Sequence, residues 1–389
     1  MTLPNSVQAA LNSLVAALEE AFATPEPAPV PTPTPEPEPT PEPTPVPTPV
    51  PTTVLYGPTG KHDFGLPAAS AVHEVEPTWA AIKTQATSCQ SHAGRCDIAV
   101  KPGTLPSGTS ASSSTAGVLS SVGSTGKIVV IRPRDGFGTV KVGAGKGTAF
   151  VGLKGIYFDR IDFSATDAVM VRNSDTFGFA KTRVQQLLGT ANNSTPLRNG
   201  KFVEVVAGPE MVTGVGYDRA QFKTASGGTI DGLQFIGCYI APNWKPKGDS
   251  GHCDSVQFEQ LSGGGGAITN VTFEDTALFR SSDQGVQTNA LRGGLLKKSA
   301  FFGWDATKHR YPLYPGGDPA TLDNVLNGAW TDIVAEDTVV SGSISNTYSF
   351  KSVVRSKSTQ ATRGFATLGS ISSSELDRIA PVPTDSLWR

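Results

Sequence analysis

The sequence predicts an all-β protein, a parallel β-helix in which short strands wind repeatedly around one core. An eight-residue pattern recurs, with apolar residues at its first, third and last positions and an apolar or small residue at the sixth. Its alternation changes parity once, which predicts two short strands joined by a tight turn. Copies occupy residues 156–163, 177–184, 215–222 and 233–240, and looser ones begin at Val271 and Leu295.

A second, shorter pattern lies between these copies and predicts a third strand in each turn of the coil. Units of this size cannot bury an apolar face alone, so they must stack on one another. The spacing of the copies is uneven, which places the variation in loops that leave one edge of the coil. The pattern reads Val-Met-Val at 169–171, Val-Glu-Val at 203–205, Val-Gln-Phe at 256–258 and Val-Gln-Thr at 286–288.

Composition agrees with this fold and argues against several classes of function. The 389 residues include 42 glycines and 30 prolines, and only 17% are charged, which suits strands and turns better than helices. A net charge of −2 argues against a nucleic-acid partner. The sequence has no run of about 18 apolar residues, so no membrane insertion is expected. Its N-terminus lacks the pattern of a secretion signal.

The first 53 residues predict an anchor followed by a spacer. Residues 1–24 carry apolar residues at alternating four- and three-residue steps from Val7 to Ala21, which predicts an amphipathic helix. Docking on another protein and self-association both fit such a helix. In residues 25–53 proline takes almost every second position, which predicts a polyproline II spacer on the order of 90 Å long.

The β-helix domain is expected over residues 54–355, with a C-terminal tail over 356–389. A helix predicted over 76–87 would cover the open end of the coil. Cys89 and Cys96 are close enough for a disulfide, and free thiols fit equally well. Cys238 occupies an inward position of the eight-residue pattern, so we expect it to be buried.

The order of elements after residue 75 resembles a known superfamily. A helix followed by "IAVKPGTL", "KIVVIRP", "VKVGAG" and "LKGIYFDRIDF" is similar to the opening of pectate-lyase-like right-handed β-helix proteins. The resemblance covers about residues 75–355 and implies the fold rather than one activity, because the superfamily includes lyases, hydrolases and phage tailspikes. With the predicted helix and spacer in front, the chain resembles phage tailspikes and minor tail proteins most. That likeness implies a virion location, a trimer and contacts with other tail proteins through residues 1–24.

Long loops and strand parity predict a groove. The segments 185–202, 241–255 and 303–329 would wall it along one edge of the Val-x-Val sheet, where binding residues concentrate. The residues between the inward positions would form its floor. Candidate catalytic residues are carboxylates, because two of them at suitable separation hydrolyse glycosides. These candidates are Glu204 and Asp231, expected to be neighbours, together with Glu259 and Asp254.

The densest polar cluster is His252-Cys253-Asp254-Ser255-Val256-Gln257. It resembles the H-x-D-x-x-Q block of many β-helix proteins from phages and bacteria, and the run from Asp283 to Gln287 repeats it one turn later. Amides and carboxylates in register suit carbohydrate hydroxyls, which donate and accept; a purely structural stack at the turns is the alternative. No metal or cofactor pattern is seen. The expected glycan-binding residues are His252, Gln257, Asp283, Gln287, Trp244, Trp304 and Tyr311.

Three functions therefore stay open. The first is a phage tail spike that recognises a host surface glycan and cleaves or merely binds it. The second is a bacterial cell-associated polysaccharide hydrolase or lyase, located outside the cell or on its surface. The third is a structural or decoration fibre without enzyme activity. The spacer favours the first and third, and the histidine–acid cluster in a walled groove favours the first and second.

Overall fold

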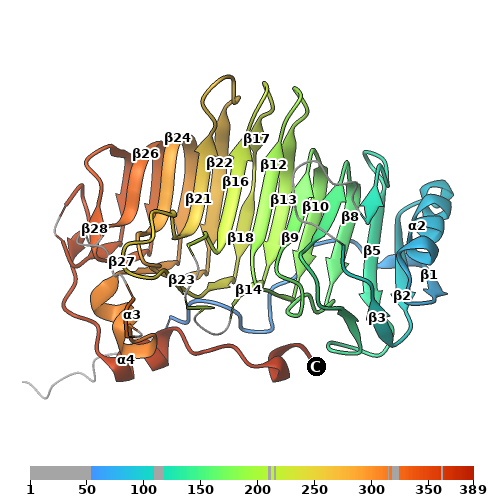
Figure 1. Ribbon diagram of the computed structural model, residues 1–389, viewed down its shortest axis with the longest axis horizontal. Coiled ribbons are helices and arrows are strands. Elements are labelled where there is room, and N and C mark those ends of the chain that lie inside the picture. The colour runs from blue at the N-terminus through green and yellow to red at the C-terminus, as the bar shows by residue number, and fades with distance from the viewer. Residues whose placement is uncertain are drawn as a thin grey trace, which may run out of the picture. The chain divides into compact units, whose positions relative to one another are not determined.

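The computed structural model describes residues 54–108, 118–208, 212–213, 216–313, 315–317, 324–360 and 362–389 (Figure 1). Residues Thr52–Arg389 form one compact unit. The helix expected over 1–24 and the spacer expected over 25–53 lie outside the described residues. In the described part of the chain, no helix is long and apolar enough to span a membrane.

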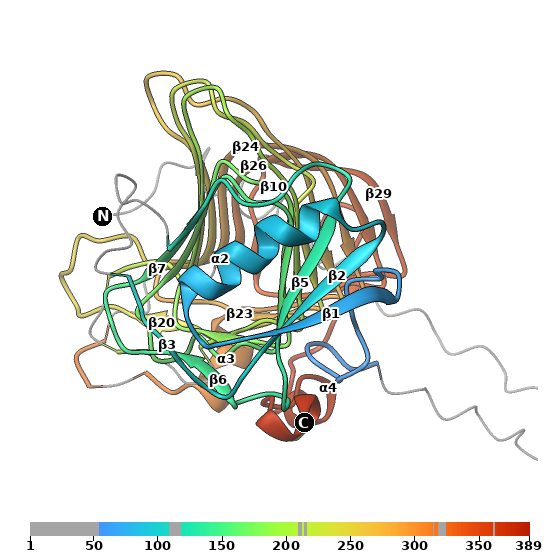
Figure 2. The same ribbon diagram turned by 90° about the vertical axis from the view of Figure 1, so that its right-hand side faces the viewer.

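The described chain forms a parallel β-helix with three faces, which Figure 2 shows end-on. Each full turn runs through sheet I, sheet II and sheet III in that order, and neighbouring turns pair in parallel. Sheets I and III are continuous where the long strands β24 and β26 bend from one to the other.

Sheet I contains β1 (Ala69–Val75), β2 (Arg95–Val100), β5 (Ile128–Pro133), β8 (Lys154–Asp159), β10 (Asp175–Ala180), β13 (Leu197–Val203), β18 (Gln234–Ile236), β22 (Ile268–Glu274), the second halves of β24 (Gln284–Lys297) and β26 (Asn324–Glu336), and β29 (Tyr348–Val354). Sheet II contains β11 (Arg183–Val184), β14 (Val206–Ala207), β19 (Tyr239–Ile240), β23 (Ala277–Phe279), β25 (Ala300–Phe302), β27 (Val339–Ser341), β30 (Lys357–Ser358) and β31 (Ala366–Thr367). Sheet III contains β4 (Leu119–Ser120), β7 (Thr148–Val151), β9 (Val169–Arg172), β12 (Leu187–Ala191), β16 (Ala220–Thr224), β21 (Asp254–Gln260), the first halves of β24 and β26, and β28 (Ser343–Ile344).

Three short strand sets lie outside these faces. The pairs β3 (Gly103–Leu105) with β6 (Val140–Val142) and β15 (Val212–Thr213) with β20 (Asn243–Trp244) are small separate sheets. Strand β17 (Ile230–Asp231) lies between sheets III and I and pairs with the start of β13.

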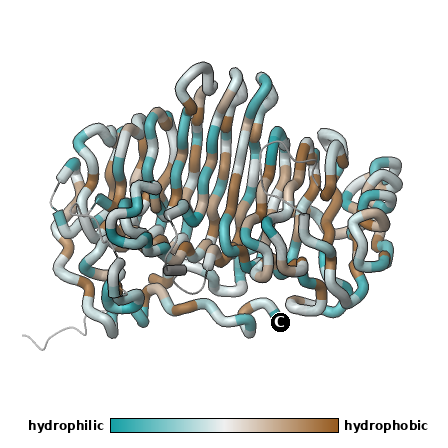
Figure 3. Tube along the Cα trace, viewed as in Figure 1, coloured by the Kyte–Doolittle hydropathy of each residue, from teal (hydrophilic) through white to brown (hydrophobic). Residues whose placement is uncertain are grey.

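The core is built from apolar residues that repeat in register from turn to turn. Along the strands of the coil, hydrophobic and hydrophilic residues alternate (Figure 3), as one buried and one exposed face require. Stacked turns lie about 4.8 Å apart, so equal residue types at equal positions stack. In sheet I the rings of Phe158 and Phe179 lie 4.9 Å apart, those of Phe202 and Phe235 5.0 Å, and those of Phe235 and Phe273 4.9 Å.

The parity change in the eight-residue pattern has a structural cause at the corner between sheets I and II. In the eight turns from β8 to β29, one residue takes a left-handed conformation there, with φ between 44° and 61°. The next residue turns inward and is buried, for example Thr276, whose hydroxyl donates to Phe235 O of the preceding turn at 3.1 Å. This explains why the sixth position is apolar or small. The left-handed corner residues are Arg160, Lys181, Glu204, Gly237, Asp275, Lys298, Asp337 and Arg355.

One copy of the pattern was assigned wrongly. Residues 215–222 do not form it, because Ala220 and Phe222 lie in β16 of sheet III. The true copy in that turn includes Gly200 and Phe202 of β13. Glycine replaces the large apolar residue because a Cβ at Gly200 would lie 2.5 Å from the ring of Phe177. The expected loop 185–202 is consequently wrong as well, since it contains β12 and most of β13.

Helices and the C-terminal segment cover the coil at one end and along one side. Helix α2 (Trp79–Ser88) lies across the end of the coil (Figure 2), and Thr78 caps it by accepting a bond from Ala81 N at 3.2 Å. A disulfide joins Cys89 in the 3-10 helix η1 (Cys89–Ser91) to Cys96. The C-terminal segment runs along the lower side in Figure 1 and contains α4 (Ser373–Ile379) and η2 (Asp385–Trp388).

Candidate functional site

The candidate site lies where the chain enters sheet III after leaving sheet II. Two connections precede the sheet here, the segment ending at Arg219 and the loop over residues 241–253. Strands β16 and β21 pair in register, with Gln221 opposite Gln257. Residues near the start of each strand are therefore brought together although more than thirty residues separate them in sequence.

Two buried carboxyl groups occupy the centre of the site. Asp254 is fully buried and Asp218 is 2% exposed. The Asp218 Oδ1 atom accepts the backbone N–H of Asp254 at 2.8 Å, and its Oδ2 atom accepts Nε2 of Gln221 at 2.5 Å. The Asp254 Oδ1 atom is buried without a hydrogen-bond partner among the described residues. A buried carboxyl oxygen without a partner is costly, which points to a ligand or a proton at this position.

Charged side chains surround this pair. His252, whose side chain is 58% exposed, places Nδ1 3.1 Å from Asp254 Oδ2. Lys245 donates to Asp283 at 2.7 Å and to Gly251 O at 3.1 Å. Asp283 also accepts the backbone N–H of Cys253 at 2.8 Å. The exposed imidazole of His252 thus covers the buried Asp254, and Lys245 and Asp283 neutralise each other beside it.

Burial and mutual repulsion set the protonation of the cluster. Burial, and then the charge of Asp254, raise the pKa of Asp218 to about 7. Burial also raises the pKa of Asp254, although the hydrogen bond from His252 opposes it. That same hydrogen bond raises the pKa of His252 to about 9. Near neutral pH Asp218 can therefore hold a proton, while Asp254 is hydrogen-bonded to a charged imidazole.

A row of amides extends from the cluster across sheet III. Gln221, Gln257, Gln287 and Asn327 occupy paired positions on successive strands. Gln221 donates to Gln257 Oε1 at 2.7 Å, and Asn327 donates to Gln287 Oε1 at 2.8 Å. Three spacings of about 4.8 Å between these four strands make the row on the order of 14 Å long. We call these four residues the amide row.

The cluster has the residue types of a metal site. Ligand atoms of His252, Asp254 and Asp283 lie within 4.8 Å of one another. Asp283, however, already binds the Lys245 ammonium with both carboxylate oxygens. A divalent cation would have to displace that ammonium, so the donor set fits a protonated acid–base cluster better than a cation.

The expected pair of Glu204 and Asp231 is wrong. Glu204 is a left-handed corner residue between sheets I and II, fully buried, and accepts bonds from His62 and Trp388. Asp231 pairs with Arg198, six residues before Glu204, so about 20 Å of strand separates them. Asp231 instead accepts from Thr269 Oγ1 at 2.6 Å. Neither carboxylate lies on sheet III: Val203 is the last residue of β13 in sheet I and Glu204 follows it, while Asp231 lies in β17.

Of the other residues predicted to bind or cleave a glycan, some lie on sheet III and others lie outside sheet II. Glu259 lies on sheet III, but Lys223 neutralises it at 2.9 Å. Trp244 is fully buried with its ring 5.5 Å from that of Trp304, which begins helix α3 (Trp304–Arg310). Tyr311 is buried as well. The expectation that Trp244 and Tyr311 are open to a sugar is wrong, because they pack in the apolar cluster outside sheet II.

Sequence reasoning missed three residues of the site. Asp218 and Gln221 were hidden because residues 215–222 were assigned to the eight-residue pattern. Asn327 precedes a glycine that ends the first half of β26, where no pattern was recognised. The missed signal was Asp218-x-x-Gln221, the same spacing as Asp254-x-x-Gln257 one turn later.

Known proteins resemble the chain only distantly. No protein-family model and no curated protein matches the sequence. Among solved structures, ORF18 of Geobacillus virus E2 aligns with 73% of this chain at a TM-score of 0.30 and 10% identity; the chain spans 60% of that protein. The alginate lyase of Paenibacillus sp. str. FPU-7 aligns with 78% at 0.27 and 9% identity, covering 99% of the lyase. The A-module of the Azotobacter vinelandii mannuronan C-5 epimerase AlgE4 aligns with 79% at 0.25 and 11% identity, covering 98% of the module. By its own topology the chain is a parallel β-helix protein.

Proposed function

We propose that the protein binds a polysaccharide along the amide row and hydrolyses it at the cluster of Asp218, Asp254 and His252. One observation carries the proposal: a row of amides on sheet III ends at two buried carboxyl groups beneath an exposed imidazole. Amides complement sugar hydroxyls because both donate and accept hydrogen bonds. The row is long enough for about three sugar units, if each unit takes about 5 Å.

The cluster supplies the groups that glycoside hydrolysis needs. A protonated acid gives its proton to the leaving oxygen, and a carboxylate assists water or attacks the sugar carbon. Burial raises the pKa of Asp218 to about 7, so this acid can hold the required proton near neutral pH. Asp254 has the oxygen without a partner and is assigned as the second carboxyl group of the reaction; because it is fully buried beneath His252, substrate reaches it only when that exposed side chain moves aside. His252 positions Asp254 and adds positive charge beside it.

Hydrolysis is favoured over β-elimination by the state of Lys245. A lyase needs an unprotonated base that removes a ring proton next to a carboxylate. Lys245 is the cationic side chain nearest to Asp283, but it is largely buried and tied to that carboxylate. The ion pair holds the Lys245 side chain on Asp283 and away from the role of that base.

The setting we propose is the tail of a bacteriophage, with the protein as a spike that attaches to a host surface glycan. The pattern of residues 1–53, an amphipathic helix followed by a proline-rich spacer, supports a protein mounted on a larger assembly. A bacterial cell-associated hydrolase would carry the same chemistry. Immunogold labelling of purified virions separates the two settings: tail labelling supports a spike, and label restricted to bacterial surfaces contradicts it.

Binding is tested with a panel of purified bacterial capsular and cell-wall polysaccharides. Gln257→Ala and Gln287→Ala each remove one hydrogen-bonding side chain and should weaken binding about tenfold. Gln234→Ala is the matched control, because Gln234 is a half-buried amide on sheet I, away from the amide row. Equal losses in all three variants, or none in the first two, would place the glycan elsewhere.

A further inference from the structure

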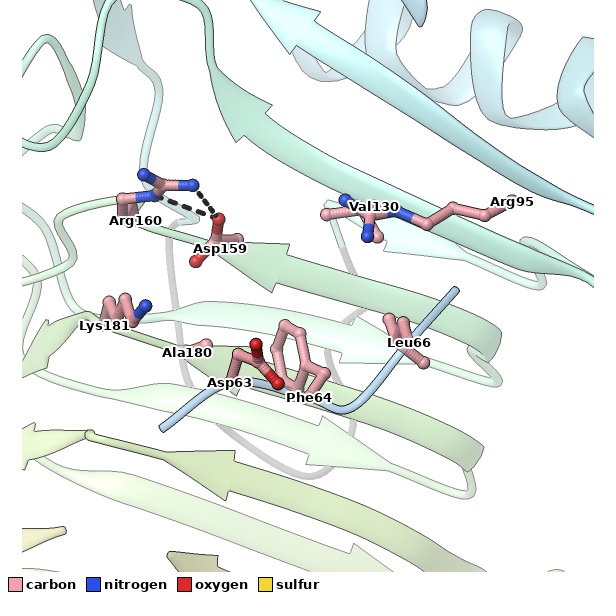
Figure 4. Close-up of a pocket in the computed structure, with 9 residues that line it drawn as sticks. All are labelled: Asp63, Phe64, Leu66, Arg95, Val130, Asp159, Arg160, Ala180 and Lys181. Carbon is pink, nitrogen blue, oxygen red and sulfur yellow. Dashed lines mark hydrogen bonds and ion pairs between the residues drawn. The ribbon is translucent and has the colours of Figure 1, made fainter. Parts of the chain in front are cut away.

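A cavity of about 210 Å³ lies on the outer face of sheet I, beneath the N-terminal segment (Figure 4). Val130 of β5 and Ala180 of β10 contribute small apolar side chains from the sheet. Phe64 and Leu66 come from the N-terminal segment that crosses these strands. The remaining lining residues are charged: Asp63, Arg95, Asp159, Arg160 and Lys181.

The segment over this cavity is fixed at both ends. On one side, the ring nitrogens of His62 lie 3.2 Å from Glu204 Oε1 and 3.1 Å from Asp275 Oδ2. On the other side, Arg95 Nη1 donates to Pro67 O at 3.0 Å. A segment held in this way cannot sink onto the sheet, so the space beneath it persists without a ligand.

The aromatic wall of the cavity is also fixed. Phe64 is 7% exposed, and its carbonyl accepts Lys201 Nζ at 3.1 Å. Its ring fits because residue 178 of β10 is glycine: a Cβ there would lie 2.5 Å from Phe64 Cε1 and 2.8 Å from the Tyr157 ring. A rigid ring beside open space is the arrangement that binds the C–H face of a sugar.

One cation of the cavity, Lys181, is available to an anionic ligand. Its lining contains three positive and two negative residues. Arg160 is paired with Asp159 at 2.7 Å, and Arg95 with Asp97 at 2.6 Å. Among the described residues, the Lys181 ammonium has no ion pair or hydrogen bond. Asp63 and Lys181 are the two lining charges outside these pairs, and a carboxylate placed beside Lys181 would give that ammonium an ion-pair partner.

We infer that this cavity binds a single acidic sugar ring. The ring carboxylate would meet Lys181 and the outer edge of Arg160, and its apolar face would pack on Phe64. Oxygens of Asp63 and Asp159 would accept its hydroxyls. Because the volume is below the roughly 300 Å³ of the smaller drug-sized sites, one ring fits and a chain does not. The site goes beyond the proposed hydrolase, since it lies on sheet I whereas the amide row lies on sheet III.

The test titrates the full chain with sodium D-glucuronate at low ionic strength, followed by saturation-transfer NMR and calorimetry. Lys181→Asn should weaken binding about tenfold or more. Lys298→Asn is the matched control, because Lys298 is an exposed lysine at the same left-handed corner, with φ 44° against 51° for Lys181. Asparagine tolerates this conformation at both positions. D-glucose should bind at least about tenfold more weakly than glucuronate. Added salt should weaken the binding of glucuronate and leave that of glucose unchanged.

Three results would overturn the inference. The first is no saturation transfer from glucuronate. The second is equal loss of binding in the Lys181 and Lys298 variants, which would indicate general charge attraction. The third is acetate binding as tightly as glucuronate, which would reduce the site to an anion contact without sugar recognition. None of these results bears on Asp254 or the amide row, so the proposed hydrolase stands or falls separately.

Discussion

Replacing His62 by glutamine should loosen the N-terminal segment in a pH-dependent way. His62 lies over Gly237 at the corner between sheets I and II and bridges Glu204 of the preceding turn and Asp275 of the following one. Hydrogen bonds to Asp275 and then to Glu204 raise the pKa of His62 to about 9 from 6.5. Glutamine keeps a hydrogen-bonding group but carries no charge.

The size of the effect follows from this difference in pKa. At about 1.36 kcal/mol per pH unit, the difference between 6.5 and 9 corresponds to about 3.4 kcal/mol. Because 22% of the His62 side chain is exposed to solvent, screening leaves about half, roughly 1.5–2 kcal/mol. The folded pKa lies above the unfolded one, so this stabilisation is complete below pH 6.5 and disappears as the pH rises through about 9.

The stabilisation by Glu204, the acidic partner of His62, depends on pH in the opposite direction. Burial opposes ionisation of Glu204, but bonds from His62, Thr59 and Trp388 outweigh it and lower its pKa below 4.5. Its contribution is present above pH 4.5 and is lost as the pH falls through the lowered value. The contact is therefore strongest between about pH 4.5 and 6.5.

Hydrogen exchange at the backbone amides of Thr59 and His62 measures this contact directly, because both donate to Glu204 Oε1. Compared at equal pH, His62→Gln should speed exchange roughly ten- to thirtyfold below pH 6.5 and leave it almost unchanged above pH 9. His309→Gln, an exposed histidine of α3, is the control and should change neither amide. An equal effect of His62→Gln at both pH values would refute the electrostatic explanation.

Three further predictions concern packing and covalent structure. Gly178→Ala should cost about 1–3 kcal/mol in urea denaturation, because the new methyl overlaps the Phe64 ring; unchanged stability would mean that Phe64 does not pack there. Cys238 is buried and burial raises its pKa to about 12, so it should react with a thiol reagent only on unfolding; rapid native labelling would contradict this. Reduction of the Cys89–Cys96 bond, which closes a loop of sequence separation 7, should lower stability by about 2.5 kcal/mol; equal midpoints with and without reductant would show that the loop contributes nothing.

The sequence was informative wherever the signal is local. Period-two alternation predicted the inward position of Cys238, and the common register of Gln257 and Gln287 followed from the repeated Val-Gln pattern. The bond between His252 and Asp254 joins residues only two positions apart. Each of these features depends on the alternation of inward and outward residues within one short strand, so that alternation is sufficient to predict it.

Features that depend on turns far apart in sequence were not predictable in the same way. The contact between Asp218 and Asp254 can be predicted only if the register of β16 is known. Gly200 hides that register, because it takes the place of a large apolar residue and leaves room for the Phe177 ring. The same glycine hides that Glu204 follows β13 of sheet I and does not lie on sheet III. Trp244 and Tyr311 lie in loops, and the composition of a loop does not reveal which face of the coil it will cover.

The most direct test of the proposed function follows the chain length of a bacterial polysaccharide that the protein binds, by size-exclusion chromatography with light scattering. Wild-type protein should shorten the polymer, and Asp254→Asn should bind it while leaving its length unchanged. Asp218→Asn should slow shortening strongly, because the acid that holds the proton is lost. A wild-type protein that leaves a bound polymer intact, or an Asp254→Asn variant that shortens it at the wild-type rate, would contradict the assignment of this cluster as a hydrolase centre.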